Sequence, residues 1–369
     1  MDLSKAFDTV ERDILYNKMT NIGFADNANN LIKDYMSRRK LCMKGNVHKT
    51  YALNYGVPQG SILGPLLFLI YINDMDSICT DIDKLVYADD TPVIVKGKTF
   101  EEAQRKANNT LETFYRYFSL NKLSINEGKT KYMIYDFRSK KKKKDDTKHI
   151  TLTMNKVILE QVKKIRFLGV VINDSLTWTD HKCHIKSKIS KALGIIYSSR
   201  DIVKPKHLIN IYKAFIQPYF SYCISIWGSS VKSDNDCLVR LQNKVLRIMF
   251  ACKRTEDVYR FIQSDTIIKL EHLYKIELAK LCLHHQRNEL PSQIQNIMPD
   301  IKKNSHHKIS TRSGDTHDYI YNEKDKKTLS LHCIRLWNNL PKHIKDIAHT
   351  TTKNTKRYCH SVHSHLLQN

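Results

Sequence analysis

The chain has 369 residues, of which 41% are hydrophobic and 27% charged, and it carries a formal net charge of +24. This composition is typical of a globular protein with two or three domains and excludes a largely disordered chain. The longest apolar run, 62–72, is interrupted by Gly64 and Pro65 and is too short to span a bilayer. No signal peptide is recognisable, and the nine cysteines lack the spacing of a disulfide framework. We therefore expect an intracellular protein with no membrane partner.

The positive charge is concentrated in the later part of the chain. Residues 1–100 contain twelve basic and twelve acidic residues, so residues 101–369 carry the whole excess of +24. Such an excess favours a polyanionic partner, because each neutralised phosphate releases counterions. A basic surface that serves only solubility is the alternative.

Apolar spacing predicts a mixture of helices and strands, which indicates an α+β fold. The helices expected early in the chain cover residues 10–22, 25–39, 65–73 and 100–118. A hairpin is expected over 41–55 around Lys44-Gly45-Asn46, and strands over 132–135, 150–154 and 165–172. The later helices are expected over 185–200, 206–217, 236–250 and 267–286.

The tetrapeptide Tyr87-Ala88-Asp89-Asp90 lies between two short apolar runs and predicts a β-hairpin with two carboxylates at its turn. Adjacent anions repel each other unless solvent or a cation neutralises them. The two interpretations are an ordinary solvated turn and part of a metal site.

Two basic features follow. In the helix expected over 236–250, Arg240, Lys244 and Arg247 share the face opposite the apolar residues, which predicts a nucleic-acid contact. The run Lys140–Lys144 predicts a solvated loop, with a nuclear-import or phosphate-binding patch as the alternative.

Three motifs occur in order: Asp2-Leu3-Ser4-Lys5-Ala6-Phe7-Asp8, the segment Gly56-Val57-Pro58-Gln59-Gly60-Ser61-Ile62-Leu63-Gly64-Pro65, and Tyr87-Ala88-Asp89-Asp90. They resemble successive palm motifs of reverse transcriptases from non-LTR (LINE-type, jockey-like) retrotransposons. Later segments resemble the next palm motif, the primer grip, the start of the thumb and a C-terminal signature of the same elements: Leu123-Ser124-Ile125-Asn126 through Gly128-Lys129-Thr130, Phe167-Leu168-Gly169-Val170, Trp178 with His181, and Leu336-Trp337-Asn338-Asn339-Leu340-Pro341.

The resemblance implies a partial right-hand polymerase. It divides the chain into a palm over 1–165 that lacks fingers, a primer grip and helical thumb over 166–235, and a basic, mostly helical C-terminal region over 236–369. The implied activity is RNA-directed DNA polymerase, which extends a DNA primer on an RNA template with dNTPs. Nuclear localisation is expected for it.

The resemblance also implies roles for individual residues. Asp2, Asp89 and Asp90 would hold two Mg²⁺ ions, about 3.5–4 Å apart in such sites. The residues expected around the nucleotide are Leu3 (through its carbonyl), Phe7, Gln59, Gly60 and Lys129. The residues expected to position the primer end are Phe167, Leu168 and Gly169. Asp8 is expected to be structural.

Two departures from the family pattern bear on activity. Asp2 directly follows Met1, so the fingers and the start of the palm strand are expected to be absent and Asp2 is expected to fray. Pro92, just after the turn, removes a backbone donor from a hairpin strand.

Three alternatives therefore stay open beside the polymerase. One is a catalytically inactive fragment that retains RNA or DNA binding, and another is a group II intron maturase. The third is zinc binding, at His181, Cys183 and His184 or at Cys359, His360, His363 and His365, although neither cluster has the paired spacing of a structural zinc site.

Overall fold

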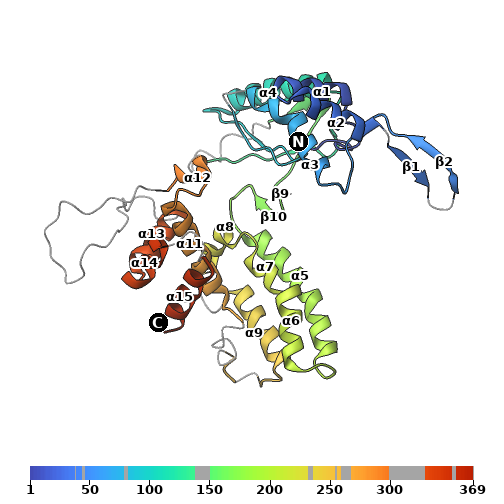
Figure 1. Cartoon of the computed structure of the whole chain (residues 1–369). Helices are drawn as coiled ribbons and strands as arrows, with labels where there is room; N and C mark the ends of the chain where they lie inside the picture. Colours follow the sequence, from blue (N-terminus) through green and yellow to red (C-terminus); the bar gives the residue numbers. More distant parts are fainter. Residues whose placement is uncertain are drawn as a thin grey trace. The chain divides into compact units, whose positions relative to one another are not determined.

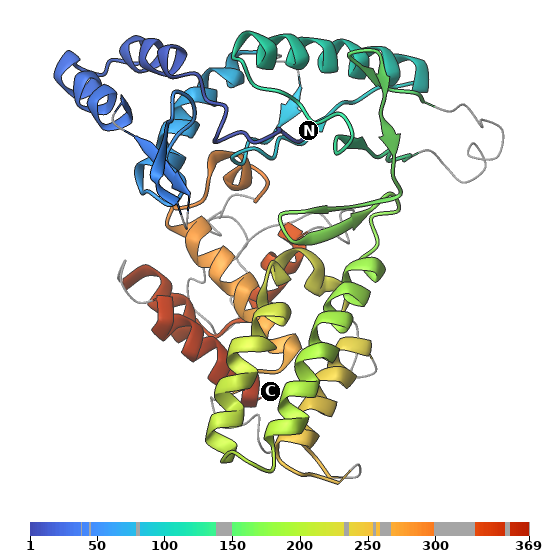
Figure 2. The ribbon, with the colours of Figure 1, turned by 90° about the vertical axis from the view of Figure 1, so that its right-hand side faces the viewer.

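The protein is described by a computed structural model that covers residues 1–37, 39–43, 46–78, 82–137, 150–231, 236–253, 256–258, 267–298, 329–350 and 355–368. It divides into two compact units, Met1–Ile165 and Arg166–Asn369. Figures 1 and 2 show the elements of both. The Lys140–Lys144 run and the turn residues 44 and 45 lie outside the described residues. Within the described residues, no helix is long and apolar enough to cross a membrane.

The first unit combines helices with short strands. Its helices are α1 (Arg12–Asn21), α2 (Asp26–Ser37), α3 (Leu63–Ile72), the 3-10 helix η1 (Asn73–Ser77) and α4 (Phe100–Leu120). Its strands are β1 (Lys40–Met43), β2 (Asn46–Ala52), β3 (Asp83–Lys84), β4 (Val93–Ile94), β5 (Lys131–Tyr132), β6 (Thr153–Met154), β7 (Val157–Ile158) and β8 (Glu160–Gln161). The pairs β1–β2, β3–β4 and β6–β7 are antiparallel, whereas β5 and β8 are parallel. An α+β content is thus confirmed for this unit.

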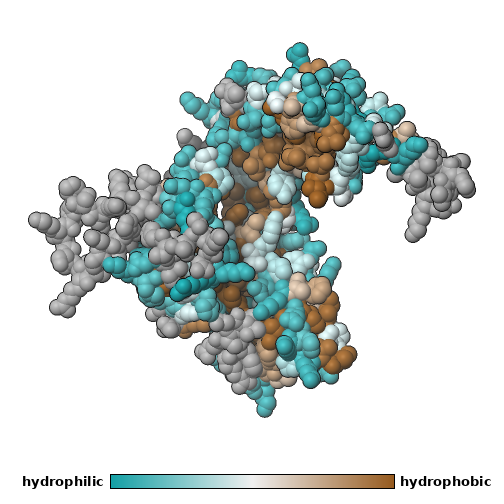
Figure 3. Space-filling model, viewed as in Figure 1, coloured by the Kyte–Doolittle hydropathy of each residue, from teal (hydrophilic) through white to brown (hydrophobic). Residues whose placement is uncertain are grey.

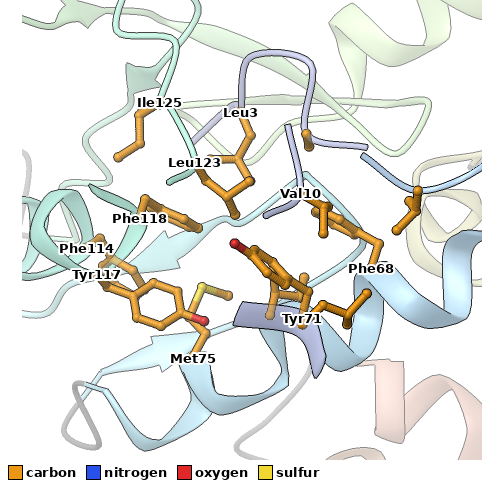
Figure 4. Packing of buried hydrophobic residues seen from close by; sticks show 14 of the residues in the cluster. Leu3, Val10, Phe68, Tyr71, Met75, Phe114, Tyr117, Phe118, Leu123 and Ile125 are labelled. Atoms are coloured by element: carbon orange, nitrogen blue, oxygen red, sulfur yellow. The ribbon is translucent and has the colours of Figure 1, made fainter. Parts of the chain in front are cut away.

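The core of the first unit gathers side chains from distant parts of the sequence. Figure 4 shows Leu3, Phe68 and Phe114 in this core with Leu123 and Ile125. Helix α4 is amphipathic and begins at an N-cap, Thr99, whose side chain accepts a hydrogen bond from the Glu102 N–H. The core therefore holds the segment around Leu3 against the segment around Ile125.

The hydroxyl groups of two buried tyrosines form hydrogen bonds inside the same core. The Tyr71 hydroxyl donates to the Asn121 carbonyl at 2.6 Å, and burial is the main cause that raises its pKa to about 12. The Tyr117 hydroxyl donates to the Asp74 carboxylate at 2.6 Å. These bonds join α4 and its C-terminal turn to the end of α3 and to η1.

The second unit begins within a hairpin and continues as helices. Strand β9 (Lys164–Phe167) crosses the boundary between the units and pairs with β10 (Val170–Asn173). The helices that follow are α5 (Thr179–Ser199), α6 (Pro205–Phe215), α7 (Gln217–Ser221), α8 (Ile224–Trp227), η2 (Gly228–Ser230), α9 (Cys237–Met249), α11 (Leu270–Gln286), α12 (Ser292–Gln295), α13 (Leu329–Asn339), α14 (Lys342–Thr350) and α15 (Thr355–Gln368). One apolar cluster joins α5, α6 and α9 to the start of α11, and another joins α11 to α13 and α15.

Buried polar side chains join the helices of this second unit. Gln242 on α9 donates to the Tyr212 hydroxyl and the Ile268 carbonyl, and its own carbonyl accepts from the Leu270 N–H. Lys182 on α5 reaches the Asp236 carboxylate at 2.6 Å, and Asp236 also caps the N-terminus of α9. Because all of these groups are paired, they fix α9 against α5, α6 and α11.

The strands differ most from the sequence expectations. The strand expected over 132–135 is only Lys131–Tyr132, and the one expected over 150–154 is reduced to Thr153–Met154. The expectation of one continuous strand over 165–172 is wrong. Positive φ angles at Leu168 (43°) and Gly169 (83°) turn the chain there and form the β9–β10 hairpin.

Helix limits differ less, although the expected helix over 185–200 begins earlier, at Thr179. The helix expected over 65–73 is apolar but not fully buried: Leu66 and Leu69 of α3 are half exposed, and the preceding Ile62 is 95% exposed. On the face seen in Figure 3, hydrophilic and hydrophobic residues are mixed.

Candidate active site

The Tyr87–Asp90 tetrapeptide forms a two-residue hairpin turn. The Tyr87 N–H donates to the Asp90 carbonyl and the Asp90 N–H donates to the Tyr87 carbonyl, each at 3.0 Å. Ala88 has a φ of 52° at the first turn position, which is uncommon for a residue with a Cβ. The turn thus holds a strained backbone beside its two carboxylates, and such strain is found often at functional sites.

Residues 1–3 form a short extended segment, with one bridged residue at Leu3, between this hairpin and a second segment. On one edge, the Met1 nitrogen donates to the Thr91 carbonyl at 2.9 Å and the Thr91 N–H donates to the Met1 carbonyl at 3.4 Å. On the other edge, the Asn126 N–H donates to the Asp2 carbonyl at 2.8 Å, and Leu3 forms an antiparallel bridge with Ile125. The expectation that Asp2 frays is therefore wrong, because backbone bonds hold its strand on both edges.

The register of these bonds places two acidic residues at opposite positions. Met1 pairs with Thr91 through two backbone bonds, so the antiparallel alternation places Asp2 opposite Asp90 as the next pair. Like charges at opposite positions repel. Burial, and then the carboxylates of Asp89 and Asp2, raise the pKa of the Asp90 carboxyl above its usual value. Three acidic groups thus act on one another at this turn.

The alternation of side chains along the strand separates Asp2 from Leu3. Leu3 is buried in the core, so Asp2 lies on the opposite face of the strand. The Asp2 N–H donates to the Thr130 hydroxyl at 3.3 Å. The Lys129 ammonium lies 3.9 Å from Asp2 Oδ2 and is largely exposed. Lys129, expected from the sequence beside the nucleotide, therefore lies next to the acidic group.

The acidic group suits a divalent cation by its donor chemistry. Carboxylate oxygens are the ligands that Mg²⁺ prefers. Burial first, and then the neighbouring Asp89 and Asp2, raise the pKa of Asp90, so a cation beside these carboxylates would favour their charged form. Among the described residues, however, no group of three or more His, Cys, Asp or Glu side chains converges closely enough to hold a metal ion. The residues fit such an ion in kind, and their side chains have to rotate toward one another to bind it.

The residues expected around the nucleotide also lie in the first unit. The ring of Phe7 packs against Phe68 of α3 with 4.6 Å between the ring centroids. The Gln59 side chain donates to the Asp8 carboxylate at 2.8 Å. Gly60 is exposed and has a φ of 82°, a backbone conformation that favours glycine.

A glycine joins the two motifs that carry these residues. The Val57 N–H donates to the Phe7 carbonyl and the Gly56 N–H donates to the Val10 carbonyl, each at 2.8 Å. A Cβ at Gly56 would lie 2.7 Å from the Asp8 carbonyl oxygen. The close approach of the two segments therefore depends on the missing side chain of Gly56.

Pro92 lies on a bonded position of the hairpin. The register of Asp83 with Ile94 and of Tyr87 with Asp90 places Pro92 opposite Leu85. The Leu85 N–H donates to the Pro92 carbonyl at 3.1 Å, but proline has no N–H to return the bond. The hairpin lacks one rung, as the sequence predicted.

The residues expected to grip the primer form the β9–β10 turn of the second unit. The Tyr222 hydroxyl donates to the Leu168 carbonyl at 2.6 Å. A Cβ on Gly169 would lie 3.1 Å from the Tyr222 ring. The His181 Nδ1 of α5 accepts a bond of 3.3 Å from the Val171 N–H of β10, so α5 and Tyr222 both support this hairpin.

The basic stripe lies on α9 as the sequence predicted. Leu238 and Val245 are buried on one face, Arg240 and Lys244 are exposed, and Arg247 is partly exposed. At the two candidate zinc clusters, His181 and His363 are buried. Neither cluster places three such side chains together within the described residues.

Sequence reasoning missed several residues that hold the backbone of the site in place by hydrogen bonds. Thr91, Thr130 and Asn126 hold the strand of Asp2, and Tyr222 supports the primer-grip turn. Only Thr130 and Asn126 carried a signal, since both lie within a motif that resembled the family. The pairing of Asp8 with Gln59 was also missed.

Comparison with known proteins supports the same family. Residues 1–172 match the family described as reverse transcriptase (RNA-dependent DNA polymerase). The chain is 23% identical over 287 residues to the probable RNA-directed DNA polymerase from transposon X-element of Drosophila melanogaster, covering 74% of this chain and 31% of that protein. It is 24% identical over 301 residues to the RNA-directed DNA polymerase from mobile element jockey of the same fly, covering 77% and 32%.

A jockey polymerase from Drosophila funebris is 26% identical over 260 residues, covering 67% of this chain and 27% of that protein. The chain thus spans about a third of the length of the curated relatives that it matches. Residues 1–172 therefore match a reverse transcriptase domain, and the chain resembles the LINE-type reverse transcriptases of non-LTR retrotransposons.

Proposed function

We propose that the chain is an RNA-directed DNA polymerase that extends a DNA primer on an RNA template. The observation that carries the proposal is the register that places Asp2 opposite Asp90, with Asp89 beside them at the turn. In this proposal, residues 1–165 are the palm, 166–235 the primer grip and thumb, and 236–369 a basic C-terminal region. Nuclear localisation belongs to the same proposal, because the product is to be joined to chromosomal DNA.

Asp2, Asp89 and Asp90 would hold two Mg²⁺ ions. When bound, these ions supply the charge that lowers the pKa of a primer 3′-hydroxyl and stabilises the departing pyrophosphate. The strand alternation directs the Leu3 carbonyl toward the hairpin edge, as it does that of Met1, which suits a further oxygen donor there. Lys129, beside Asp2, is suited to contact the pyrophosphate.

Phe7 and Gln59 are proposed to shape the nucleotide site. Because Phe7 packs against Phe68, its ring has a fixed position from which it can exclude the 2′-hydroxyl of a ribonucleotide. The bond from Gln59 to Asp8 orients that amide near Phe7. At Gly60 no protein atom lies within 4 Å of the position a Cβ would take, which leaves room for a template or nucleotide. The turn of Phe167, Leu168 and Gly169 is proposed to position the primer end.

The test is primer extension by the full chain on a poly(rA) template with an oligo(dT) primer, Mg²⁺ and dTTP. We expect extension by the wild type and its loss in Asp89→Asn. Asp83→Asn is the matched control, since Asp83 lies in the same hairpin but pairs with Lys96 at the exposed surface, where an ion pair contributes little. Equal activity of the wild type and Asp89→Asn would contradict the proposal.

A second candidate is a protein that binds RNA or DNA without catalysis. The basic stripe on α9 and the charge of +24 favour it, since neither feature depends on the carboxylates. Salt-sensitive RNA binding by a wild type that gives no extension is the result expected for this candidate.

A further inference from the structure

A pocket of about 480 Å³ lies in the second unit, and neither the β9–β10 turn nor the basic stripe of α9 contributes to its lining. Residues of α11, α13, α15 and η2 line it, and α11 contacts each of the other three. Helices α11, α13 and α15 are labelled in Figure 1. The volume is that of a small-molecule or nucleotide site, for which about 300–1,000 Å³ is usual.

The floor of the pocket is apolar and aromatic. Leu278 and Leu340 are buried, and the Tyr274 ring lies directly over Gly228. A Cβ at Gly228 would lie 2.5 Å from Tyr274 Cδ2, so the ring position requires the glycine. The Tyr274 ring meets the edge of His332 at 6.1 Å between centroids. A flat apolar group can therefore lie against this floor.

The rim of the pocket is basic. Lys275 and Arg335 are exposed on α11 and α13, and the lining residues His332 and His365 are partly exposed. Glu271 is the acidic residue of the lining. Lys275 and Arg335 outnumber this carboxylate, so the rim attracts an anion.

A ligand with a flat aromatic body and adjoining negative charge matches both features. We propose that this pocket takes one unstacked base of a single-stranded nucleic acid, with the neighbouring phosphates held by Lys275 and Arg335. Bases of a duplex are stacked and paired and do not enter such a slot, whereas single-stranded bases stack on aromatic side chains. The inference rests on the nucleic-acid partner of the proposed function and is independent of its catalysis.

The test measures binding of a labelled fifteen-nucleotide RNA to the full chain by fluorescence anisotropy, with EDTA and no dNTP. The variant is Lys275→Ser/Arg335→Ser. The control is Lys342→Ser/Arg357→Ser, which removes the same charge from two exposed residues outside the pocket, on α14 and α15. We expect the pocket pair to weaken binding about tenfold and the control pair by no more than about threefold, because only the pocket pair loses defined phosphate contacts. Circular dichroism and melting of both variants establish that they are folded.

A second experiment varies the nucleic acid and leaves the protein unchanged, so no substitution of a buried residue in the pocket floor is needed. The RNA should bind more tightly than its duplex and more tightly than an abasic backbone of equal length, because only the RNA offers a free base. Equal weakening by the two pairs, or equal affinity for the abasic backbone, would overturn the proposal. Displacement of the RNA by free AMP or poly-glutamate at the same phosphate or carboxylate concentration would also overturn it, in favour of a free nucleotide or an acidic peptide.

The same binding assay on Asp89→Asn separates this inference from the polymerase proposal. Loss of extension with pocket-dependent binding retained contradicts neither. Absence of extension in the wild type with such binding retained overturns only the polymerase. Extension by the wild type with equal weakening by both charge pairs overturns only the pocket.

Discussion

The two units place charge by different means. In the first unit, Asp2 and Asp90 come together because backbone bonds join strands that lie about ninety residues apart in the sequence. In the second, Arg240 and Lys244 share a face because they lie four residues apart on α9. The acidic group thus depends on long-range register, whereas the basic stripe depends on local periodicity.

The units also differ in how they respond to acid. In the first unit, burial and then repulsion from Asp89 and Asp2 raise the pKa of Asp90, and protonation of this carboxyl relieves both. In the second unit, burial is the main cause that lowers the pKa of His181 and of His272 to about 4. Acid therefore removes a repulsion in one unit and forces charge into the core of the other.

The largest effect is expected at the acidic group. Asp2→Asn removes one of the proposed metal ligands and should lower the primer-extension rate by about a thousandfold or more, equivalent to several kcal/mol of transition-state stabilisation. Affinity for single-stranded RNA should stay within about twofold, because the basic residues proposed to bind it lie on other elements than Asp2. A parallel loss of binding and extension would show that the functions are not divided between the units in this way.

The second effect concerns pH. An unfolded histidine binds a proton near pH 6.5, whereas folded His181 and His272 do so only near pH 4. The unfolded state therefore binds protons first, and stability falls from about pH 6.5 downward, by about 3 kcal/mol per histidine once the pH is below both values. Trp178, Trp227 and Trp337 all lie in the second unit, so tryptophan fluorescence during denaturant unfolding follows this unit alone.

His272→Gln tests the assignment, because glutamine stays neutral throughout this pH range. The variant should lose about 3 kcal/mol less than the wild type between pH 7 and pH 4. His207→Gln, on the exposed surface of α6, is the control and should leave the acid response unchanged. An unaltered response in His272→Gln would show that other groups cause it.

The third effect concerns the stripe. Arg240→Ser/Lys244→Ser should weaken RNA binding about tenfold and make the slope of log affinity against log salt about 1.4 less steep, as expected for two lost single-strand phosphate contacts. Lys206→Ser/Lys213→Ser removes the same charge from exposed positions on α6 and should change the slope little. Anisotropy titrations at several salt concentrations make the comparison. Identical slopes for both pairs would show that the stripe makes no defined contact.

The smallest effect is expected in the hairpin. Pro92→Val supplies the missing N–H opposite the Leu85 carbonyl and should stabilise the first unit by about 0.5–1 kcal/mol, since the new bond exceeds the loss of proline rigidity. Amide hydrogen exchange can follow the N–H that this substitution introduces. Rapid exchange of that amide would show that the bond does not form.

Local periodicity predicted the helices better than the strands. The helix expected over 100–118 is α4 (Phe100–Leu120), and the one expected over 236–250 is α9 with Asp236 as its N-cap. In both helices the apolar residues that form the buried face are only three or four positions apart, so the pattern can be read from a short stretch of sequence. The motifs also named the residues that the first unit brings together, Asp2, Asp89, Asp90 and Lys129.

The backbone pairing around Asp2 could not be predicted. The bridge between Leu3 and Ile125 joins residues 122 positions apart, and each partner offers only a few residues of extended chain. Strands this short have no alternation to detect, and their position comes from the core in which Leu3 and Ile125 are both buried. The site roles and domain limits inferred from the family resemblance stay predictions.

The pairing of the extended segment 1–3 on both of its edges has a mechanical consequence. The segment has hydrogen-bonded neighbours on both edges, so it moves with the hairpin and with the segment 124–126 as one body. A fluctuation that separates the Asp2 and Asp90 backbones must break bonds on at least one of these edges. Loop motion therefore changes the distance between the Asp2 and Asp90 backbones little. The distance between their carboxylate oxygens is adjusted by side-chain rotation.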